Sequence, residues 1–195
     1  MKRLFRGLPT ALALAAAAWL AGCANAVIVG QADTAPGYSL TELAAAGSGE
    51  NELRVIVDGD PFGAGAAATG TATVAAMQGN VIGTPVKFAL DPVRERRPPT
   101  RVMVYFNPRN MVGGESICAP NGAVSGAAGA GGELRVIAAW CQTDFKISSV
   151  SGRTNGVTGL NSPKFRALLA GVTQSLFPQR DELRMRRGDG CQPPC

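Results

Sequence analysis

Hydrophobic and polar residues alternate along four segments of the chain with the two-residue period of a β-strand. In the first segment, Leu53, Val55 and Val57 share one face. In the third segment, Met103 and Tyr105 lie opposite a face of apolar residues, so neither face of that strand is fully polar. The predicted strands are residues 53–57, 86–90, 101–107 and 134–141.

Helical spacing appears toward the C-terminal end. Apolar residues recur at i, i+3, i+4, i+7 and i+11 over residues 165–176. Ser162 stands at the N-cap position, Pro163 at the first helical position, and Pro178 follows as a stop. This segment is the best helix that the sequence predicts.

Two further helices are predicted from weaker patterns. Asp60 as N-cap and Pro61 at the first helical position precede residues 62–78, which are mostly small. Glycines within that segment disfavour the helix. Earlier in the chain, Ser39 and Glu42 have the spacing of a capping box and predict a short helix.

The order of the main predicted elements is β, α, β, β, β, α. The simplest arrangement that buries their apolar faces is an α+β fold with two layers. We therefore expect a mostly antiparallel four-stranded sheet with two helices on one face, formed by residues 51–178. Strands 101–107 and 134–141 are expected to form a hairpin with a long glycine-rich connection.

The first residues of the chain have the organisation of a secretory signal. Three basic residues precede an apolar run over residues 8–20 that is shorter than a membrane-spanning helix requires. The run ends in Leu20-Ala21-Gly22-Cys23, which resembles the lipobox of bacterial lipoproteins at every position. The alternative is an ordinary cleavage site of the A-x-A type at Ala24-Asn25-Ala26.

The lipobox resemblance implies that Cys23 is acylated and becomes the first residue of the mature chain. Residues 1–22 are then a lipoprotein signal peptide, and residues 23–50 a lipidated tether that includes the short helix. Stable anchoring takes about two acyl chains. Because Ala24 rather than an aspartate follows the cysteine, the resemblance also implies the outer membrane, with the protein facing the periplasm.

Charge argues against a nucleic-acid partner. The whole chain has 19 Lys and Arg against 14 Asp and Glu, and three of the basic residues belong to the signal peptide. The mature chain is therefore close to neutral, which is not the balance of a nucleic-acid-binding protein.

Besides Cys23 the chain has four cysteines, and an oxidising compartment favours two disulfides among them. Three pairings are possible. Proximity in sequence favours Cys118–Cys141 and Cys191–Cys195. The first bridge would close a glycine-rich loop, and the second lies in residues 179–195, which we expect to be an irregular tail.

Catalytic motifs are missing from the sequence. It contains no histidine, which removes Ser-His-Asp and Cys-His nucleophile systems and histidine-based zinc sites. Asp58 and Asp60 follow a predicted strand and could act as an acid–base pair, but the favoured interpretation is a turn that caps a helix. We therefore predict a protein that is not an enzyme and holds no cofactor or metal.

Arginines are grouped in two places. The first group is Arg94, Arg96, Arg97 and Arg101, and the second is Arg184, Arg186 and Arg187. Guanidinium groups match phosphate oxygens, so the first group is a candidate anion-binding site. The alternative is solvated loop charge.

Two functions remain open from the sequence. The favoured one is a membrane-anchored, non-enzymatic lipoprotein of the cell envelope that binds an envelope protein or component. The alternative is a periplasmic redox or metal-binding protein that uses Cys191 and Cys195, with Met185 nearby.

Overall fold

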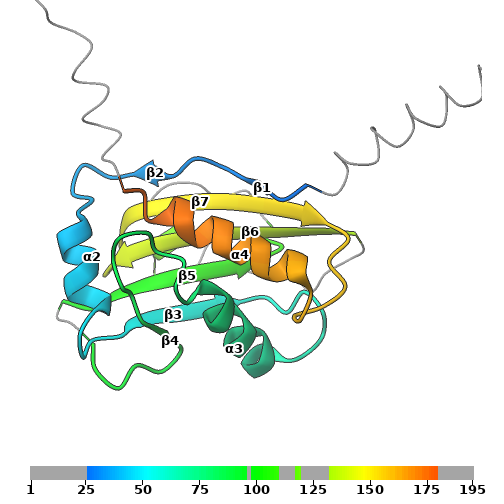
Figure 1. Cartoon of the computed structure of the whole chain (residues 1–195), viewed down its shortest axis with the longest axis horizontal. Coiled ribbons are helices and arrows are strands. Elements are labelled where there is room, and N and C mark those ends of the chain that lie inside the picture. Colours follow the sequence, from blue (N-terminus) through cyan, green and yellow to red (C-terminus); the bar gives the residue numbers. More distant parts are fainter. Residues whose placement is uncertain (1–25, 96–97, 110–116, 120–131, 180–195) are drawn as a thin grey trace, which may run out of the picture.

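A sheet with helices on one face forms the body of the protein (Figure 1). The computed structural model describes residues 26–95, 98–109, 117–119 and 132–179. Its strands are β1 (Ile28–Val29), β2 (Asp33–Thr34), β3 (Leu53–Asp58), β4 (Phe88–Ala89), β5 (Thr100–Phe106), β6 (Glu133–Gln142) and β7 (Phe145–Asn155). Its helices are α2 (Leu40–Gly47), α3 (Ala66–Met77) and α4 (Pro163–Leu176).

The sheet has seven strands in the order β1-β7-β6-β5-β3-β4, and β2 also pairs with β7. Strand β3 runs parallel to both β4 and β5, and the other pairs are antiparallel. The prediction of a four-stranded sheet with two helices is therefore wrong, because the sheet has seven strands, β3 pairs in parallel with two neighbours, and α2 belongs to the folded body as a third helix. Most strand pairs are antiparallel. The fold remains α+β.

The largest missing element in the prediction is β7. A two-residue turn, Thr143-Asp144, separates it from β6, and serine and charged residues interrupt its apolar positions. Its partners β1 and β2 have only two residues each, so neither has an alternating pattern of its own. The segment expected to be a tether, residues 23–50, thus adds β1, β2 and α2 to the fold.

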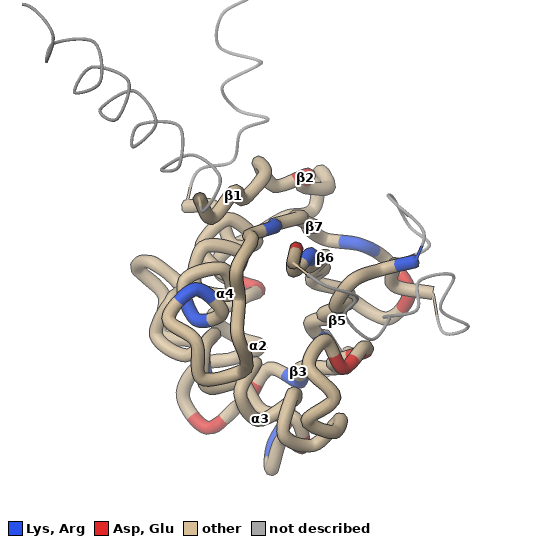
Figure 2. The backbone as a smooth tube through the Cα atoms, turned by 90° about the vertical axis from the view of Figure 1, so that its right-hand side faces the viewer, with Lys and Arg blue, Asp and Glu red and all other residues tan. Residues whose placement is uncertain are grey.

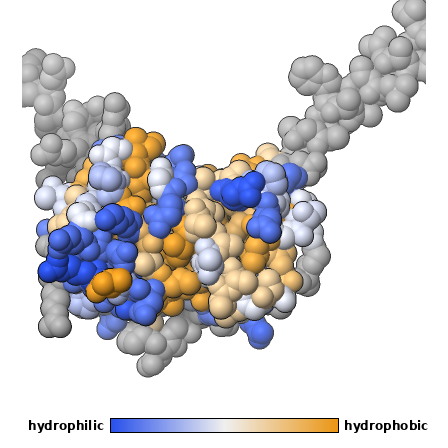
Figure 3. All heavy atoms as spheres, turned by 60° about the horizontal axis from the view of Figure 1, so that its bottom comes forward, coloured by the Kyte–Doolittle hydropathy of each residue, from blue (hydrophilic) through white to orange (hydrophobic). Residues whose placement is uncertain are grey.

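Helices α3 and α4 pack against each other and against the same face of the sheet. Strands β3, β5 and β6 direct apolar side chains toward them, among them Val55, Val104 and Trp140, each at most 1% exposed. The side of the molecule that carries α3 presents a broad hydrophobic area bordered by hydrophilic residues (Figure 3). Its exposed apolar residues include Ile82, Leu90 and Val93.

The opposite face of the sheet has a smaller buried cluster. Tyr105, Ala139 and Cys141 point to this face, and Ile117 and Cys118 pack on them. No α-helix contributes to this cluster within the described residues.

The two ends of the sheet differ. The N-terminal segment enters at the start of β1, where β7 ends and both α3 and α4 begin (Figure 1). Helix α2 lies at the other end, and there the hydroxyl of Tyr38 donates a hydrogen bond to the carbonyl of Pro178 at 2.9 Å. The entry of the chain and the last described residues therefore lie at opposite ends.

Close contact between β7 and α4 predicts the effect of adding one methyl group. A Cβ at Gly152 would lie 2.8 Å from Val172 and 2.9 Å from Leu168. We expect Gly152→Ala to lower the free energy of unfolding by about 1–3 kcal/mol, as overpacking in cores does. Gly37→Ala is the control, because a Cβ there meets nothing within 4 Å. Urea unfolding measures both, and equal stabilities would contradict the packing described.

Candidate functional site

The loop after β3 uses Asp60 as a structural acceptor. The backbone N–H groups of Ala64 and Gly65 donate to the Asp60 carboxylate at 3.0 and 2.6 Å, and the hydroxyl of Thr69 donates at 3.1 Å. Helix α3 begins at Ala66, four residues later than predicted, so Asp60 binds the start of the helix from outside it. The carboxylate of Asp60, which the sequence analysis considered as a candidate acid or base, therefore accepts hydrogen bonds that hold the loop and the start of α3.

Electrostatics supports a structural role for this loop. The hydrogen bond from Gly65, with smaller contributions from Ala64 and Thr69, lowers the pKa of Asp60 below its usual value. Across the β3–β5 pair, Tyr105 lies beside Asp58. Burial and the charge of Asp58 raise the pKa of Tyr105, so its phenol stays protonated and donates to the carbonyl of Ile117 at 3.3 Å.

The described arginines of the first group bind separate local partners. Arg94 forms an ion pair with Glu50. Arg101 donates to the carbonyl of Cys118 at 2.9 Å and lies 3.7 Å from the carboxylate of Asp144. Arg96 and Arg97 lie outside the described residues, as does the second group, Arg184, Arg186 and Arg187.

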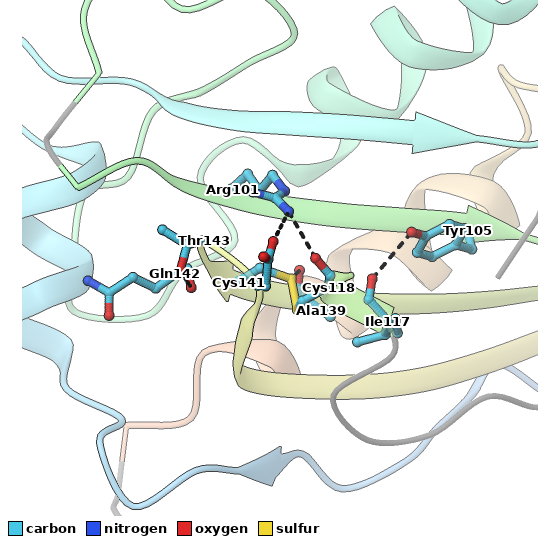
Figure 4. Close-up of a disulfide and its surroundings, with 9 residues drawn as sticks. Arg101, Tyr105, Ile117, Cys118, Ala139, Cys141, Gln142 and Thr143 are labelled. Atoms are coloured by element: carbon cyan, nitrogen blue, oxygen red, sulfur yellow. Dashed lines mark hydrogen bonds and ion pairs between the residues drawn. A yellow bond between two sulfur atoms is a disulfide. The ribbon is translucent and has the colours of Figure 1, made fainter. Parts of the chain in front are cut away.

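A disulfide joins Cys118 to Cys141, as predicted (Figure 4). Both cysteines are fully buried, and the bridge holds Ile117 and Cys118 against β5 and β6. Arg101 and Tyr105 donate to the two carbonyls of this short segment (Figure 4). Cys191 and Cys195 lie outside the described residues, so their pairing stays a prediction.

A groove of about 340 Å³ lies on the sheet across β1, β7 and β6. Pairing places Ile28, Arg153 and Arg135 in one row across these strands. Directly opposed residues of antiparallel strands share a face, so the three side chains lie on the same side of the sheet. The row makes one boundary of the groove.

The floor of the groove is formed by the neighbouring row of paired residues, Gly30, Ser151 and Ile137. Ser151 pairs with Ile137 on β6, and the N–H of Gly30 donates to the carbonyl of Ser151 at 2.8 Å. A Cβ on Gly30 would approach the Ser151 carbonyl to 3.3 Å. Because Gly30 and Ser151 are small, the groove stays open between Ile28 and Ile137.

One acidic residue positions the two arginines. Glu133, with its side chain 25% exposed, accepts a 2.5 Å hydrogen bond from Nε of Arg135 and a 3.5 Å bond from Arg153. The arginines are 57% and 56% exposed. The cluster keeps a net positive charge, and each guanidinium keeps further N–H donors for a ligand.

Sequence reasoning did not single out Arg135 or Arg153. Arg135 interrupts an apolar strand, which is a weak signal that one face of β6 is accessible. Arg153 lies on β7, which the sequence pattern did not predict, so nothing placed the two residues together. The available signal was the alternation of Ser149, Ser151 and Arg153.

Several kinds of site are absent from the part of the chain that the structure describes. No group of three or more metal-ligating side chains comes together there. No helix in the same residues has the length and apolar character to cross a membrane.

A second hollow of about 150 Å³ lies beside the loop after β3, lined by Pro61, Phe62, Asn107, Leu134 and Val157 among others.

Comparison with known proteins gives only a weak structural similarity. No protein-family model matches the chain, and no curated protein matches it. A PelC dodecamer from Paraburkholderia phytofirmans is similar with a TM-score of 0.42 and 13% identity, over 80% of this chain and 100% of that chain. A single-residue variant of that dodecamer gives a TM-score of 0.41 with the same identity and coverage. At this similarity the likeness carries no functional information for this chain.

The buried disulfide predicts a loss of stability on its removal. Replacing Cys118 and Cys141 together with serine should lower the free energy of unfolding by about 3 kcal/mol in the chain-entropy model, because the bridge spans 23 positions. Denaturant unfolding of oxidised protein measures the loss. The matched control replaces Cys191 and Cys195 with serine, which we expect to change the stability of the described fold little. An unchanged stability in the Cys118/Cys141 variant would contradict a constraining role.

The lowered pKa of Asp60 predicts a dependence of stability on pH. A carboxylate with a depressed folded-state pKa stabilises the protein above the unfolded value near 3.8, and the effect disappears as the pH falls through the lowered pKa. Asp60→Ala should therefore be less stable than the unchanged protein at neutral pH, with a difference that shrinks at about pH 3. Asp91→Ala is the control, because Asp91 is 97% exposed and its ion pair is long at 3.7 Å. A gap that stays constant with pH would argue against the ionised carboxylate as the cause.

Proposed function

We propose that the protein is a lipid-anchored lipoprotein of the cell envelope that acts as a non-enzymatic binding or accessory module. The observation that carries this proposal is the lipobox ending at Cys23, placed directly before the folded body. The proposed location is the outer membrane, facing the periplasm. The proposed partners are the membrane and an envelope protein or component.

The short distance between the anchor and the fold supports close attachment to the membrane. Strand β1 begins at Ile28, five residues after Cys23. Five residues span at most about 18 Å when fully extended. A lipid on Cys23 therefore keeps the start of β1 near the membrane surface.

Charge at the entry end agrees with this orientation. Helices α3 and α4 begin there, and helix N-termini carry partial positive charge. Figure 2 faces this end and shows Lys and Arg positions near the start of α4 and along β6 and β7. The basic residues at this end are Arg109, Arg135, Arg153, Lys164 and Arg166, and the acidic ones are Asp58, Asp60 and Glu133. The end with α2 then faces away from the membrane and is available to a partner.

The chemistry of the described residues favours binding over catalysis. Asp60 is bound by the start of α3, and Tyr105 is a buried donor to the disulfide segment. Among the described residues, the groove across β1, β7 and β6 is lined by two arginines and by apolar or small side chains, and Glu133 pairs with both arginines beside it. This arrangement suits recognition of an anionic group.

Loss of the anchor cysteine tests the proposal. In Cys23→Ser the thiol that would take the lipid is gone, so we expect the protein to be unlipidated and either uncleaved or soluble in the periplasm. Fractionation of cells and intact-mass measurement of the mature chain give the result.

The control is Cys191→Ser, which should remain in the membrane fraction with its lipid. Normal membrane fractionation of Cys23→Ser, or a mature mass without acyl chains in the unchanged protein, would overturn the lipoprotein assignment.

A further inference from the structure

We propose that the groove across β1, β7 and β6 binds the phosphate of an anionic phospholipid headgroup. This proposal rests on the proposed function, because it assigns the groove to the membrane that holds the Cys23 lipid. The arginines involved, Arg135 and Arg153, are different from the groups that stand out in the sequence.

The shape of the groove suits a headgroup and the first part of a lipid chain. Gly30 and Ser151 leave the middle low, while Ile28 and Ile137 supply apolar walls. Ile28 is 49% exposed, although it lies in a sheet strand. Its position in β1 makes it the first described side chain of the sheet after the anchor.

Charge in the groove suits a phosphate. The carboxylate of Glu133 accepts one N–H hydrogen bond from each of Arg135 and Arg153. These bonds hold both guanidinium groups over the same part of the sheet. Each guanidinium has five N–H donors in a planar fork that matches phosphate oxygens. Two arginines against one carboxylate leave a net charge of the sign that an anionic headgroup requires.

The position of the groove brings it to the membrane. Arg153 lies directly opposite Ile28 in the β1–β7 pair. Only four residues separate Cys23 from Ile28, which limits the distance of this pair from the proposed lipid-bearing cysteine. Lipid headgroups are therefore the anionic groups present beside the groove whenever the anchor is in the bilayer.

Partitioning onto vesicles tests the proposal without the anchor. The protein used is residues 23–195 with Cys23→Ser, which contains every described residue. Sedimentation with vesicles of phosphatidylcholine, alone or mixed with phosphatidylglycerol, gives the partition coefficient. We expect binding only with phosphatidylglycerol, and weaker binding at higher salt.

Charge-neutral variants locate the binding. Each basic residue near an anionic surface contributes about fivefold to partitioning, so Arg135→Gln with Arg153→Gln should reduce it about 25-fold. Glu133→Gln should increase it, because it removes the competing carboxylate. Arg94→Gln is the matched control, since it removes one exposed arginine with an acidic partner away from the groove. Circular dichroism verifies that each variant is folded.

Three results would overturn the proposal. They are absence of binding to phosphatidylglycerol, an Arg135/Arg153 double variant that binds as well as the unchanged protein, and a loss in Arg94→Gln equal to that of Arg135→Gln or Arg153→Gln measured alone. The last result would mean that general charge, not the groove, drives binding. Acylation of Cys23 is measured separately by mass, so failure of the groove and failure of the anchor are distinguishable.

Discussion

Burial of one face of α4 against β7 and β6 is the interaction on which the rest of the structure depends. The helix places Phe165 near its start, where it stacks on Phe106 with ring centroids 5.8 Å apart, and Phe177 follows its end and meets Trp140 at 5.7 Å. Gly152 allows the close approach between the two layers. Because β7 is the partner of both β1 and β2, the same contact supports the strands that receive the N-terminal segment.

The sequence predicted the helices and strands whose hydrophobic residues recur with a regular period and face the buried core. The strand at Leu53, the central pair around Val104 and Val136, and α4 all have a strong repeat and a buried face. The Cys118–Cys141 bridge was predicted from the proximity of the two cysteines in sequence. The sequence did not predict the strands that form by pairing with a neighbouring strand and have no clear hydrophobic pattern of their own. Strands β1 and β2 are too short for a pattern, and β7 has a serine-rich outer face and begins after a two-residue turn. The groove escaped prediction for this reason, because two of its three strands were not recognised.

The exposed face of the sheet is divided between two tasks. Toward the start of β5, the disulfide segment covers it, and its carbonyls are bound by Arg101 and Tyr105. Toward the end of β7, the described part of this face carries small residues and arginines, which line the groove. Arginine thus has two roles on one face: Arg101 stabilises a neighbouring loop, while Arg135 and Arg153 keep donors for a ligand. Sequence clustering favoured the first kind of arginine, although the sheet brings the second kind together.

The shortness of β1 and β2, with two residues each, has a mechanical consequence for the proposed anchor at Cys23. Tension on Cys23 loads the two-residue strand β1 first, including the 2.8 Å bond from Gly30 to Ser151, and then β2 with the bond from Ala35 to Ile147. These contacts precede α2 along the chain, and α2 is held by buried residues that include Leu43 and Ala46, so we expect the strands to separate first. Release of residues 26–37 adds roughly 40 Å to the link. In the proposed lipoprotein, the N-terminal strands would therefore act as an extension that lets the domain move away from the bilayer without unfolding its core.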